Sequence, residues 1–301
     1  MATAAEPRPA RLPLGGGKEG ATVRVHPLLC ARMIAPPAHL HRTEGRLAPL
    51  RALGIRVPRD EWPELPVQAF LVEHPGAGLM LIDTGFHAAA AVDPKQAMGR
   101  FGGLLFKEMR MEAAQAVPAQ LRELGFDPGD VRTVLLTHLH SDHASGISQF
   151  PEASFLVSAR EWQAAAEGKQ IEGYFRRQFD HAFDYRLLDF DGDDADSFAT
   201  FGRSFDVFGD GSVRLVYTPG HTAGHFSVIL RCRDRDVVVV GDAAYTLRTI
   251  EETAVPFHMK DEHRFRRSLR EIQLYLKGAP DTVVVPGHDM PAFRRLQSVY
   301  E

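Results

Sequence analysis

Short apolar runs alternate with helical spacings of apolar residues along the chain from about residue 22 onward. Residues 68–73 and 79–82 form two such runs on either side of a His74-Pro75-Gly76 turn, a pattern that predicts a β-hairpin. Further strands are expected over 131–137, 213–217, 226–230, 237–240 and 282–285. Strands therefore dominate both halves of the chain.

Helices are expected, from the spacing of apolar residues, over about 87–115, 117–124, 158–167 and 261–277. In the last of these, Phe265, Leu269 and Ile272 share one face, and Gly278 marks the end. The stretch 87–115 is rich in Met and Phe, and it is expected either to line a pocket for an alkyl chain or to pack on the core or on a dimer partner. This order of elements suits two sheets packed face to face with helices outside, although propensity alone does not distinguish that arrangement from an ordinary α+β sheet.

The composition narrows the class of protein. Of the 301 residues, 44% are hydrophobic and 25% are charged, which excludes a wholly disordered chain, a collagen-like repeat and a coiled coil. The net charge of −4 gives no basic field of the kind that attracts nucleic acid or an anionic membrane. No apolar run reaches the 18 residues of a membrane-spanning helix. We therefore expect neither nucleic acid nor a membrane as partner, and the oligomeric state, monomer or homodimer, stays open.

The first 20 residues differ in composition from the rest. They are rich in Pro, Gly, Ala and Arg, and they lack the apolar stretch of a secretory signal. The expectation is a disordered N-terminal tail over 1–20, followed by one folded domain over 21–301. Two cysteines, Cys30 and Cys232, cannot staple a chain of this size, so they indicate buried residues in a reducing, cytoplasmic setting.

Polar clusters follow the predicted strands. His138-Leu139-His140-Ser141-Asp142-His143 comes after 131–137, and Asp83-Thr84-Gly85 comes after 79–82. Three other predicted strands run into His221, Asp242 and His288. Loops held at strand ends by a rigid scaffold are where functional sites are usually built.

The histidine loop has the spacing of a metal site. His138 and His140 lie two residues apart, so they point to the same side of an extended segment, whereas Asp142 and His143 can diverge toward a second point. Imidazole suits Zn or Fe, and a carboxylate can bridge two ions. Together with the other strand ends, the candidate ligands are His138, His140, Asp142, His143, His221, Asp242 and His288. Burying such groups together without a metal would leave costly unsatisfied polar atoms.

Nine of the fourteen histidines lie outside this set. A lone histidine is more often an ordinary core or surface residue than a ligand, and we expect that role for His26, His39, His41, His74, His87, His181, His258 and His263. We expect the same of His225, although it is close enough to the cluster to support it from outside the ligand set.

The ordered set of motifs resembles the metallo-β-lactamase superfamily, which carries His-x-His-x-Asp-His after a strand, then Gly-His, then Asp, then a final Gly-His. The resemblance covers about residues 22–295 and extends to the upstream Asp-Thr-Gly. It implies an α+β fold, a four-layer αβ/βα sandwich over 21–301, with two divalent metal ions at one edge of the sheets. By resemblance, one ion is held by His138, His140 and His221, the other by Asp142, His143 and His288, and Asp242 bridges them. Zn is the default, while Fe, Mn and Co are compatible with these ligands.

Within the superfamily, the chain is most similar to the quorum-quenching N-acyl homoserine lactonases. Tyr245 follows Asp242 at the offset of their tyrosine, whereas true β-lactamases typically carry Cys or Ser in place of Asp242. Ser141 stands where familiar lactonases often have Phe, and this is expected to change the floor of the substrate pocket. The resemblance implies hydrolysis of a lactone ester, in which the Tyr245 hydroxyl stabilises the oxyanion, Asp142 passes the proton and Asp83 fixes the histidine loop.

Alternatives remain at this point. A thioesterase of the hydroxyacylglutathione type would use the same motif around His221, but that family has a basic C-terminal helical extension and only 13 residues follow His288. A phosphodiesterase or nuclease is a weaker alternative, because no basic patch appears. An alternative of another class is a metal-stabilised module that binds a ligand without turnover, which a metal count beside a lactone and ester assay would distinguish.

Overall fold

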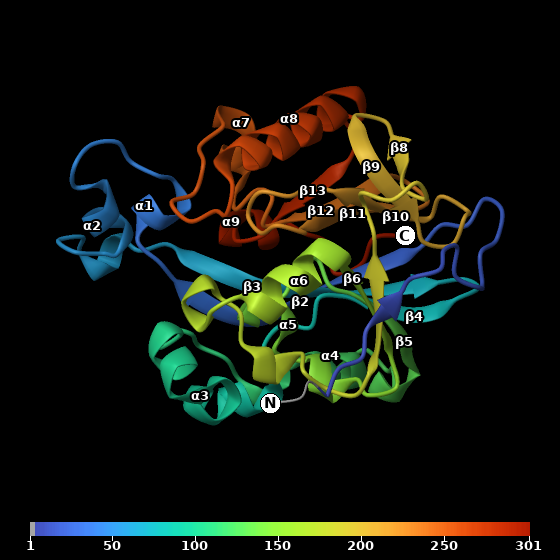
Figure 1. Cartoon of the computed structure of the whole chain (residues 1–301), viewed down its shortest axis with the longest axis horizontal. Coiled ribbons are helices and arrows are strands. Elements are labelled where there is room, and N and C mark those ends of the chain that lie inside the picture. Colours follow the sequence, from blue (N-terminus) through green and yellow to red (C-terminus); the bar gives the residue numbers. More distant parts are fainter. Residues whose placement is uncertain (1–3) are drawn as a thin grey trace.

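Two β-sheets pack face to face, and helices cover the outer side of each sheet, so that the fold has four layers (Figure 1). The computed structural model describes residues 4–301, apart from the side chains of Gln96 and Leu105. The α+β sandwich predicted for the chain is confirmed by this arrangement. Across residues 4–301, no helix is long and apolar enough to cross a membrane.

The first sheet contains, among the described residues, seven strands in the spatial order β1 (Arg8–Pro9), β7 (Asp184–Leu188), β6 (Ser154–Ser158), β5 (Val131–Leu135), β4 (Gly78–Ile82), β3 (Glu64–His74) and β2 (Arg24–Ile34). β3 and β4 form the expected hairpin, with Phe70 opposite Ile82. β4 and β5 are parallel neighbours, with Ile82 opposite Leu135. Their carboxyl ends therefore meet at one edge, and this brings Asp83 close to the histidine loop.

The second sheet has, in the described part of the chain, six strands in the order β13 (Val283–Pro286), β12 (Asp236–Gly241), β11 (Phe226–Arg231), β10 (Val213–Tyr217), β9 (Phe201–Asp206) and β8 (Asp196–Phe198). β12 and β13 are parallel, with Val239 opposite Val285. β10 and β12 both pair antiparallel with β11, so they run in the same direction. The loops after β10, β12 and β13, which carry three of the candidate ligands, consequently leave the sheet at a common edge.

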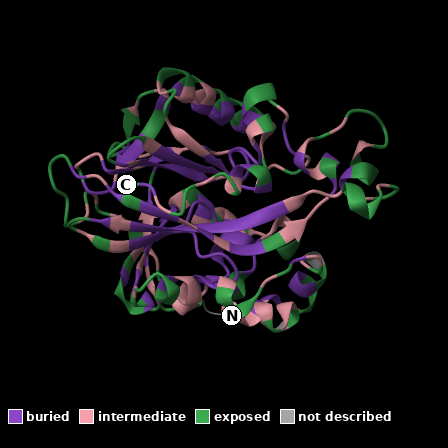
Figure 2. Cartoon of the chain, turned by 180° about the vertical axis from the view of Figure 1, so that it is seen from behind, coloured by how far each residue is buried: buried purple, intermediate pink, exposed green. Residues whose placement is uncertain are grey.

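Three apolar clusters hold the layers together, and their residues form the buried centre of the molecule (Figure 2). The cluster between the sheets includes Phe70, Ile82 and Leu215. The outer side of the first sheet packs against helices α3 (Pro94–Leu105), α4 (Val117–Glu123), α5 (Ser141–Ala144) and α6 (Ala159–Glu167). The outer side of the second sheet is covered by α7 (Leu247–Glu252) and α8 (Glu262–Gly278). Of the short helices, α1 (Pro37–Leu40) packs near Tyr245 through Leu40, α9 (Met290–Phe293) follows the loop after β13, and α2 (Ala48–Ala52) projects from the sheets at the left of Figure 1.

Helix α8 follows the sequence prediction closely. The carboxylate of Asp261 accepts a hydrogen bond from the Arg264 backbone amide at 3.0 Å, which satisfies one of the free donors at the helix start. Phe265, Leu269 and Ile272 are each 1% exposed, so the predicted apolar face is the buried one.

The predicted helix over 87–115 is interrupted in the structure. α3 contains a kink at Gly99, whose φ of +76° lies in the left-handed region that glycine adopts without a steric penalty. Met98 is buried and Phe106 packs on Phe86 at 5.2 Å between ring centroids, which is packing on the core, whereas Phe101 is partly exposed. The helix prediction is thus correct over only part of this stretch, because Gly99 breaks the continuity of the helix.

The N-terminal segment differs from the sequence expectation. Residues 1–20 were expected to be a disordered tail, but Arg8–Pro9 pairs with Arg186–Leu187 as β1, and the Leu14 amide donates to the Val207 carbonyl at 2.7 Å. Residues 1–3 of that tail lie outside the described residues. The segment is ordered because Leu12 and Leu14 pack on the core between the sheets, a long-range contact that the local composition does not indicate.

His74, at the turn between β3 and β4, is linked to this segment through Asp210, which also binds the Lys18 amide. Its Nδ1 accepts the backbone amides of Gly76 and Ala77 at 3.1 and 3.0 Å, and its Nε2 lies 3.2 Å from Oδ2 of Asp210. The same Asp210 oxygen accepts the Lys18 amide at 2.9 Å. Burial lowers the pKa of His74 against the opposing effect of Asp210, so the neutral ring that these contacts require is favoured.

Candidate metal centre

The seven candidate ligands converge at one edge of the two sheets although they come from four separate loops. Each is at most 9% exposed except His140, which is half-buried. The first sheet supplies the loop after β5 and the second sheet supplies the loops after β10, β12 and β13. The ligand atoms form three groups whose members lie within 4.8 Å of one another.

The first group consists of His138, His140 and His221. Nδ1 of His140 lies 3.0 Å from Nε2 of His221, and the rings of His138 and His221 are nearly perpendicular, with their centroids 4.9 Å apart. Three imidazole nitrogens at this separation match the coordination shell that divalent transition metals take from protein sites.

The second group consists of Asp142, His143 and His288. Oδ2 of Asp142 lies 3.7 Å from Nε2 of His143 and 3.6 Å from Nε2 of His288. The helix α5 begins directly after His140, so Asp142 and His143 turn away from the first group, as their sequence positions predict.

Asp242 lies between the two groups. With His138 and His143 it forms the third group, which shares one histidine with each of the other two. Its carboxylate oxygens are 3.2 Å from Nε2 of His221, 3.3 Å from Nε2 of His288 and 3.5 Å from Nε2 of His143. Although burial acts in the opposite direction, His288 and the other histidines hold the pKa of Asp242 well below its usual range. The side chain is therefore an anion placed to contact both groups.

The histidines differ in protonation. Burial and the neighbouring histidine rings hold the pKa of His138 well below its usual value, and burial lowers the pKa of His140 to about 4. His143 behaves oppositely, because Asp142, Asp83 and Asp242 outweigh burial and raise its pKa to about 10. The carboxylates therefore favour a second proton on His143 when no cation is present, and a bound cation would take the place of that proton on Nε2.

Several polar atoms at the centre of the cluster have no hydrogen-bond partner among the described residues. They are Nε2 of His138, Nε2 of His143 and Oδ1 of Asp242, and all three are buried. Buried donors and acceptors without partners are rare in folded proteins and costly. The three residues come from the loops after β5 and β12, and their ligand atoms lie within 4.8 Å of one another. Two divalent cations would satisfy all of these atoms. The donor set, all nitrogen and oxygen, fits such ions.

Hydrogen bonds on the far side of the rings leave these nitrogens free. Nδ1 of His143 donates to Oδ2 of Asp83 at 2.7 Å, and Nδ1 of His288 donates to the Pro66 carbonyl at 3.1 Å. Such contacts place the proton on Nδ1 and leave the lone pair on Nε2 toward the cluster. Asp83 also accepts the hydroxyl and the amide of Thr137, so it ties the end of β4 to the end of β5. The supporting position expected for Asp83 agrees with this geometry.

His225 and Gly287 shape the position of Asp242. The Asp242 amide donates to Nε2 of His225 at 3.1 Å, which fixes the backbone at Asp242. A Cβ placed on Gly287 would overlap with Oδ1 of Asp242, so a side chain is excluded there. His225 thus supports the cluster from outside it.

Tyr245 lies beside the first group. Its hydroxyl is 3.4 Å from Nδ1 of His221, and its ring is perpendicular to that of His288 at 5.2 Å between centroids. Burial and the nearby Asp242 and Asp142 raise the pKa of the phenol well above its usual range, so it keeps its proton. The ring of His39, which the sequence placed among the incidental histidines, stacks on Tyr245 with centroids 6.4 Å apart.

Ser141 lies inside the histidine loop. It is fully buried, and its hydroxyl accepts a hydrogen bond from Nε2 of Gln178 at 2.9 Å. The same amide donates to Ser145 at 3.1 Å, so Gln178 holds both ends of α5. The short side chain serves the packing of the histidine loop.

Glu161 is a site residue that the sequence analysis missed. It is 0% exposed, and its carboxylate accepts the amide of Leu139 at 3.0 Å, the amide of Gly224 at 3.1 Å and the hydroxyl of Tyr174 at 3.1 Å. In the sequence it is one charged residue of an amphipathic helix, which usually indicates an exposed position. Its place in the first turn after a buried strand was the available signal.

Comparison with known proteins gives a consistent result. Residues 62–288 match the family model of the metallo-β-lactamase superfamily. The chain is 34% identical over 243 residues to the N-acyl homoserine lactonase AttM of Rhizobium radiobacter, covering 79% of this chain and 87% of that protein. It is 35% identical over 228 residues to a probable metallo-hydrolase of Mycobacterium tuberculosis, covering 70% of this chain and 71% of that one.

Solved structures show the same fold. A mutant of AiiA from B. thuringiensis, with N-decanoyl-L-homoserine bound at its active site, superposes with a TM-score of 0.72 at 21% identity, covering 92% of this chain and 97% of that one. A dizinc quorum-quenching lactonase, AidC, superposes with a TM-score of 0.58 at 15% identity, covering 92% and 90%.

Proposed function

Because this chain belongs to the metallo-β-lactamase superfamily, we propose that it is a metal-dependent hydrolase that opens the ester ring of lactones, with N-acyl homoserine lactones as the favoured substrates. The observation that carries this proposal is the identity of 34% across 79% of the chain with a relative named for that activity. The cluster of histidines and aspartates at the common edge of the sheets supports it.

We assign one ion to His138, His140 and His221 and a second to Asp142, His143 and His288, with Asp242 shared between them. Zinc is the first choice, because the ligands are nitrogen and oxygen atoms and the related AidC is described as a dizinc enzyme. When bound, two such ions supply Lewis-acid polarisation of an ester carbonyl and lower the pKa of water toward neutrality.

The residues of the chain have distinct roles in this proposal. Tyr245, protonated because its pKa is raised, donates its hydroxyl hydrogen to the oxyanion that develops on the ester carbonyl. Asp142, which is 9% exposed, moves the proton to the alkoxide that leaves when the ring opens. Asp83 and His225 hold the loops in place from behind.

The proposed location is the cytoplasm, and the support is that Cys30 and Cys232 are both buried as free thiols.

A direct test is hydrolysis measured by pH-stat on short and long N-acyl homoserine lactones beside a thioester and a β-lactam. We expect proton release with the lactones at a kcat/KM at least tenfold above that for the other two substrates. A higher kcat/KM for the thioester would overturn the substrate class in favour of a thioesterase. The absence of turnover with two metal ions bound would overturn the enzymatic role.

A further inference from the structure

We propose that Glu161 is the positioning residue of the three-histidine group and sets the metal affinity of that group selectively. The inference rests on the metal assignment made above and extends it to a residue outside the ligand set. Glu161 lies in the first turn of α6, and no polar side chain of the ligand set hydrogen-bonds to it among the described residues. It therefore acts through the backbone of the ligand loops.

The first line of evidence is the identity of the amides that Glu161 binds. Leu139 stands between His138 and His140 in the chain, so its amide belongs to the turn that aims both rings. Gly224 lies three residues after His221, and its amide binds the other carboxylate oxygen. One buried carboxylate thus joins the loop of the first sheet to the loop of the second sheet, at the two places that carry this group of ligands.

The second line of evidence is the contact with Tyr174. Its hydroxyl donates to Glu161 at 3.1 Å, and its ring packs on that of His140 with centroids 5.0 Å apart. A Cβ placed on Gly173 would lie 2.7 Å from the His140 ring, so the backbone approaches that ring closely as well. Glu161 and Tyr174 therefore fix His140 from two directions.

The third line of evidence is that the other group has separate supports. His143 is held by Asp83, and His288 is held by the Pro66 carbonyl and by the loop that Gln68 binds. None of these contacts involves α6. Loss of Glu161 should consequently disturb one group and spare the other.

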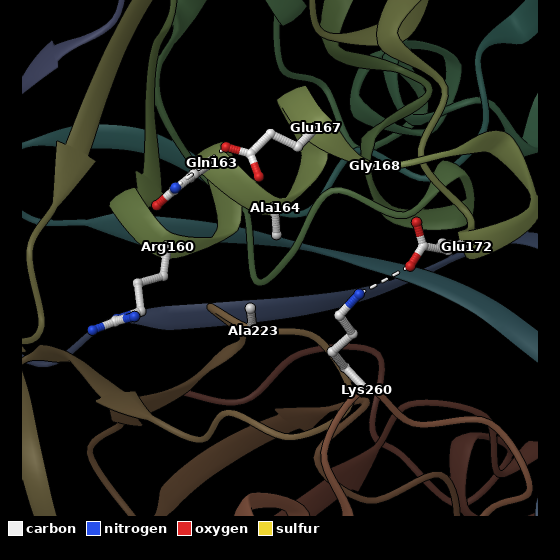
Figure 3. Close-up of a pocket in the computed structure, with 8 residues that line it drawn as sticks. All are labelled: Arg160, Gln163, Ala164, Glu167, Gly168, Glu172, Ala223 and Lys260. Atoms are coloured by element: carbon white, nitrogen blue, oxygen red, sulfur yellow. Dashed lines mark hydrogen bonds and ion pairs between the residues drawn. The ribbon is translucent and has the colours of Figure 1, made fainter.

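Other polar residues of α6 line a separate cavity (Figure 3). Arg160, Gln163 and Glu167 face a cavity of about 330 Å³ that opens to solvent, and Glu167 accepts a hydrogen bond from Gln163 at 3.3 Å. Glu167 is an exposed carboxylate on the same helix, so it provides a matched control for Glu161.

Substitution by glutamine makes the proposal testable. All three partners of Glu161 are donors, and a carboxylate only accepts. In Glu161→Gln the amide NH₂ group must face one of those donors, while volume and helix propensity stay nearly constant. We expect the affinity of one of two metal sites to fall about ten- to a hundredfold, as is typical when a group that orients a ligand is lost. Glu167→Gln should leave both affinities unchanged.

The experiment is a titration of the metal-free full-length protein with Co²⁺ and Zn²⁺, followed by absorbance and calorimetry. To assign the affected site, Glu161→Gln is combined with His140→Ala and separately with His288→Ala. The loss should persist in the His288→Ala background and disappear in the His140→Ala background. Equal weakening of both sites, or of neither, would overturn the role of Glu161.

Tyr174→Phe provides a milder variant in case Glu161→Gln does not fold. It removes one donor and keeps the ring, so the same site should weaken by a smaller factor of about two to ten, which is one hydrogen bond of about 0.5–1.5 kcal/mol. An unchanged affinity in Tyr174→Phe would count against the proposal. The readout here is metal affinity, so failure of the wild type to hydrolyse lactones would overturn only the proposed substrate. Failure of the role of Glu161 would appear instead in the metal titrations, and the two outcomes are therefore distinguishable.

Discussion

The hydroxyl oxygen of Tyr245 lies 3.4 Å from Nδ1 of His221, on the side of the imidazole opposite to the metal-facing Nε2. With the lone pair of Nε2 directed at the cluster, the proton of His221 resides on Nδ1 and points at the phenol oxygen. The phenol oxygen then acts as acceptor, and its own hydrogen remains available for a substrate. A single contact therefore links a proposed ligand to the group that would stabilise the oxyanion.

Tyr245→Phe tests this arrangement. We expect both metal ions to be retained and kcat for lactones to fall about ten- to a hundredfold, because one oxyanion donor is worth about 10²–10³ and the metal shares the charge. Metal content by mass spectrometry and kcat by pH-stat check the result. Unchanged lactone turnover in this variant would show that the oxyanion role is wrong.

Gly287→Ala tests the position of Asp242 without altering any ligand. The added Cβ would overlap with Oδ1 of Asp242 and displace the carboxylate. We expect loss of at least one metal ion and a drop in activity of more than a hundredfold. Gly278→Ala is the control, because a Cβ there meets nothing within 4 Å. Full metal occupancy in Gly287→Ala would contradict the shared role of Asp242.

Metal removal should destabilise the protein. When the ions leave, the buried polar atoms of His138, His143 and Asp242 are left without partners, which costs folding free energy. An ion present at 100–1,000 times its Kd stabilises a protein by about 2.7–4.1 kcal/mol, so chelation should lower the Tm by roughly 5–15 °C. In Asp242→Ala, metal and activity should be lost together and the chelator should have little further effect on the Tm. Asp234→Ala, an exposed aspartate, should respond to the chelator as the wild type does.

Acid should weaken the contacts of His74. Its pKa is lowered in the folded protein, mainly by burial, so the unfolded chain binds the proton more readily. The stabilisation is complete above the ordinary histidine pKa of about 6.5 and is lost as the pH falls below it, by at most about 1.4 kcal/mol per pH unit. Asn at this position keeps an acceptor for the Gly76 and Ala77 amides but does not titrate.

Denaturant unfolding of wild type and His74→Asn between pH 5 and pH 8 measures this effect. The free energy of unfolding of the wild type should decline more steeply toward pH 5 than that of the variant. Parallel pH profiles would contradict the assignment.

From the sequence, the candidate ligands could be predicted more completely than the residues that hold them in position. The ligand residues could be found because each follows a strand, and their side chains are of the types that bind metal, so local pattern was sufficient. Glu161 could not be found in this way, because a glutamate on an amphipathic helix is normally expected to be exposed to solvent. Its burial depends on its distant partners, the amides of Leu139 and Gly224.

Long-range pairing also explains the errors in the fold. The hairpin of β3 and β4 and the helix α8 depend on neighbouring residues, and both were predicted. The segment around Arg8–Pro9 is ordered only because β7, far along the chain, offers an edge to pair with. The break in α3 at Gly99 was visible as a glycine, but the apolar spacing around it favoured a continuous helix.

The division of the site between the two sheets has a consequence for the order of events during synthesis. His138, His140, Asp142 and His143 lie near the middle of the chain, whereas His288 lies close to its end. A nascent chain that has completed the first sheet possesses only half of each coordination shell. The second sheet must form and dock, including its last strand β13, before the metal groups exist as sites. Under the proposed assignment, metal uptake would be a late event that marks chains whose two sheets have already packed against each other.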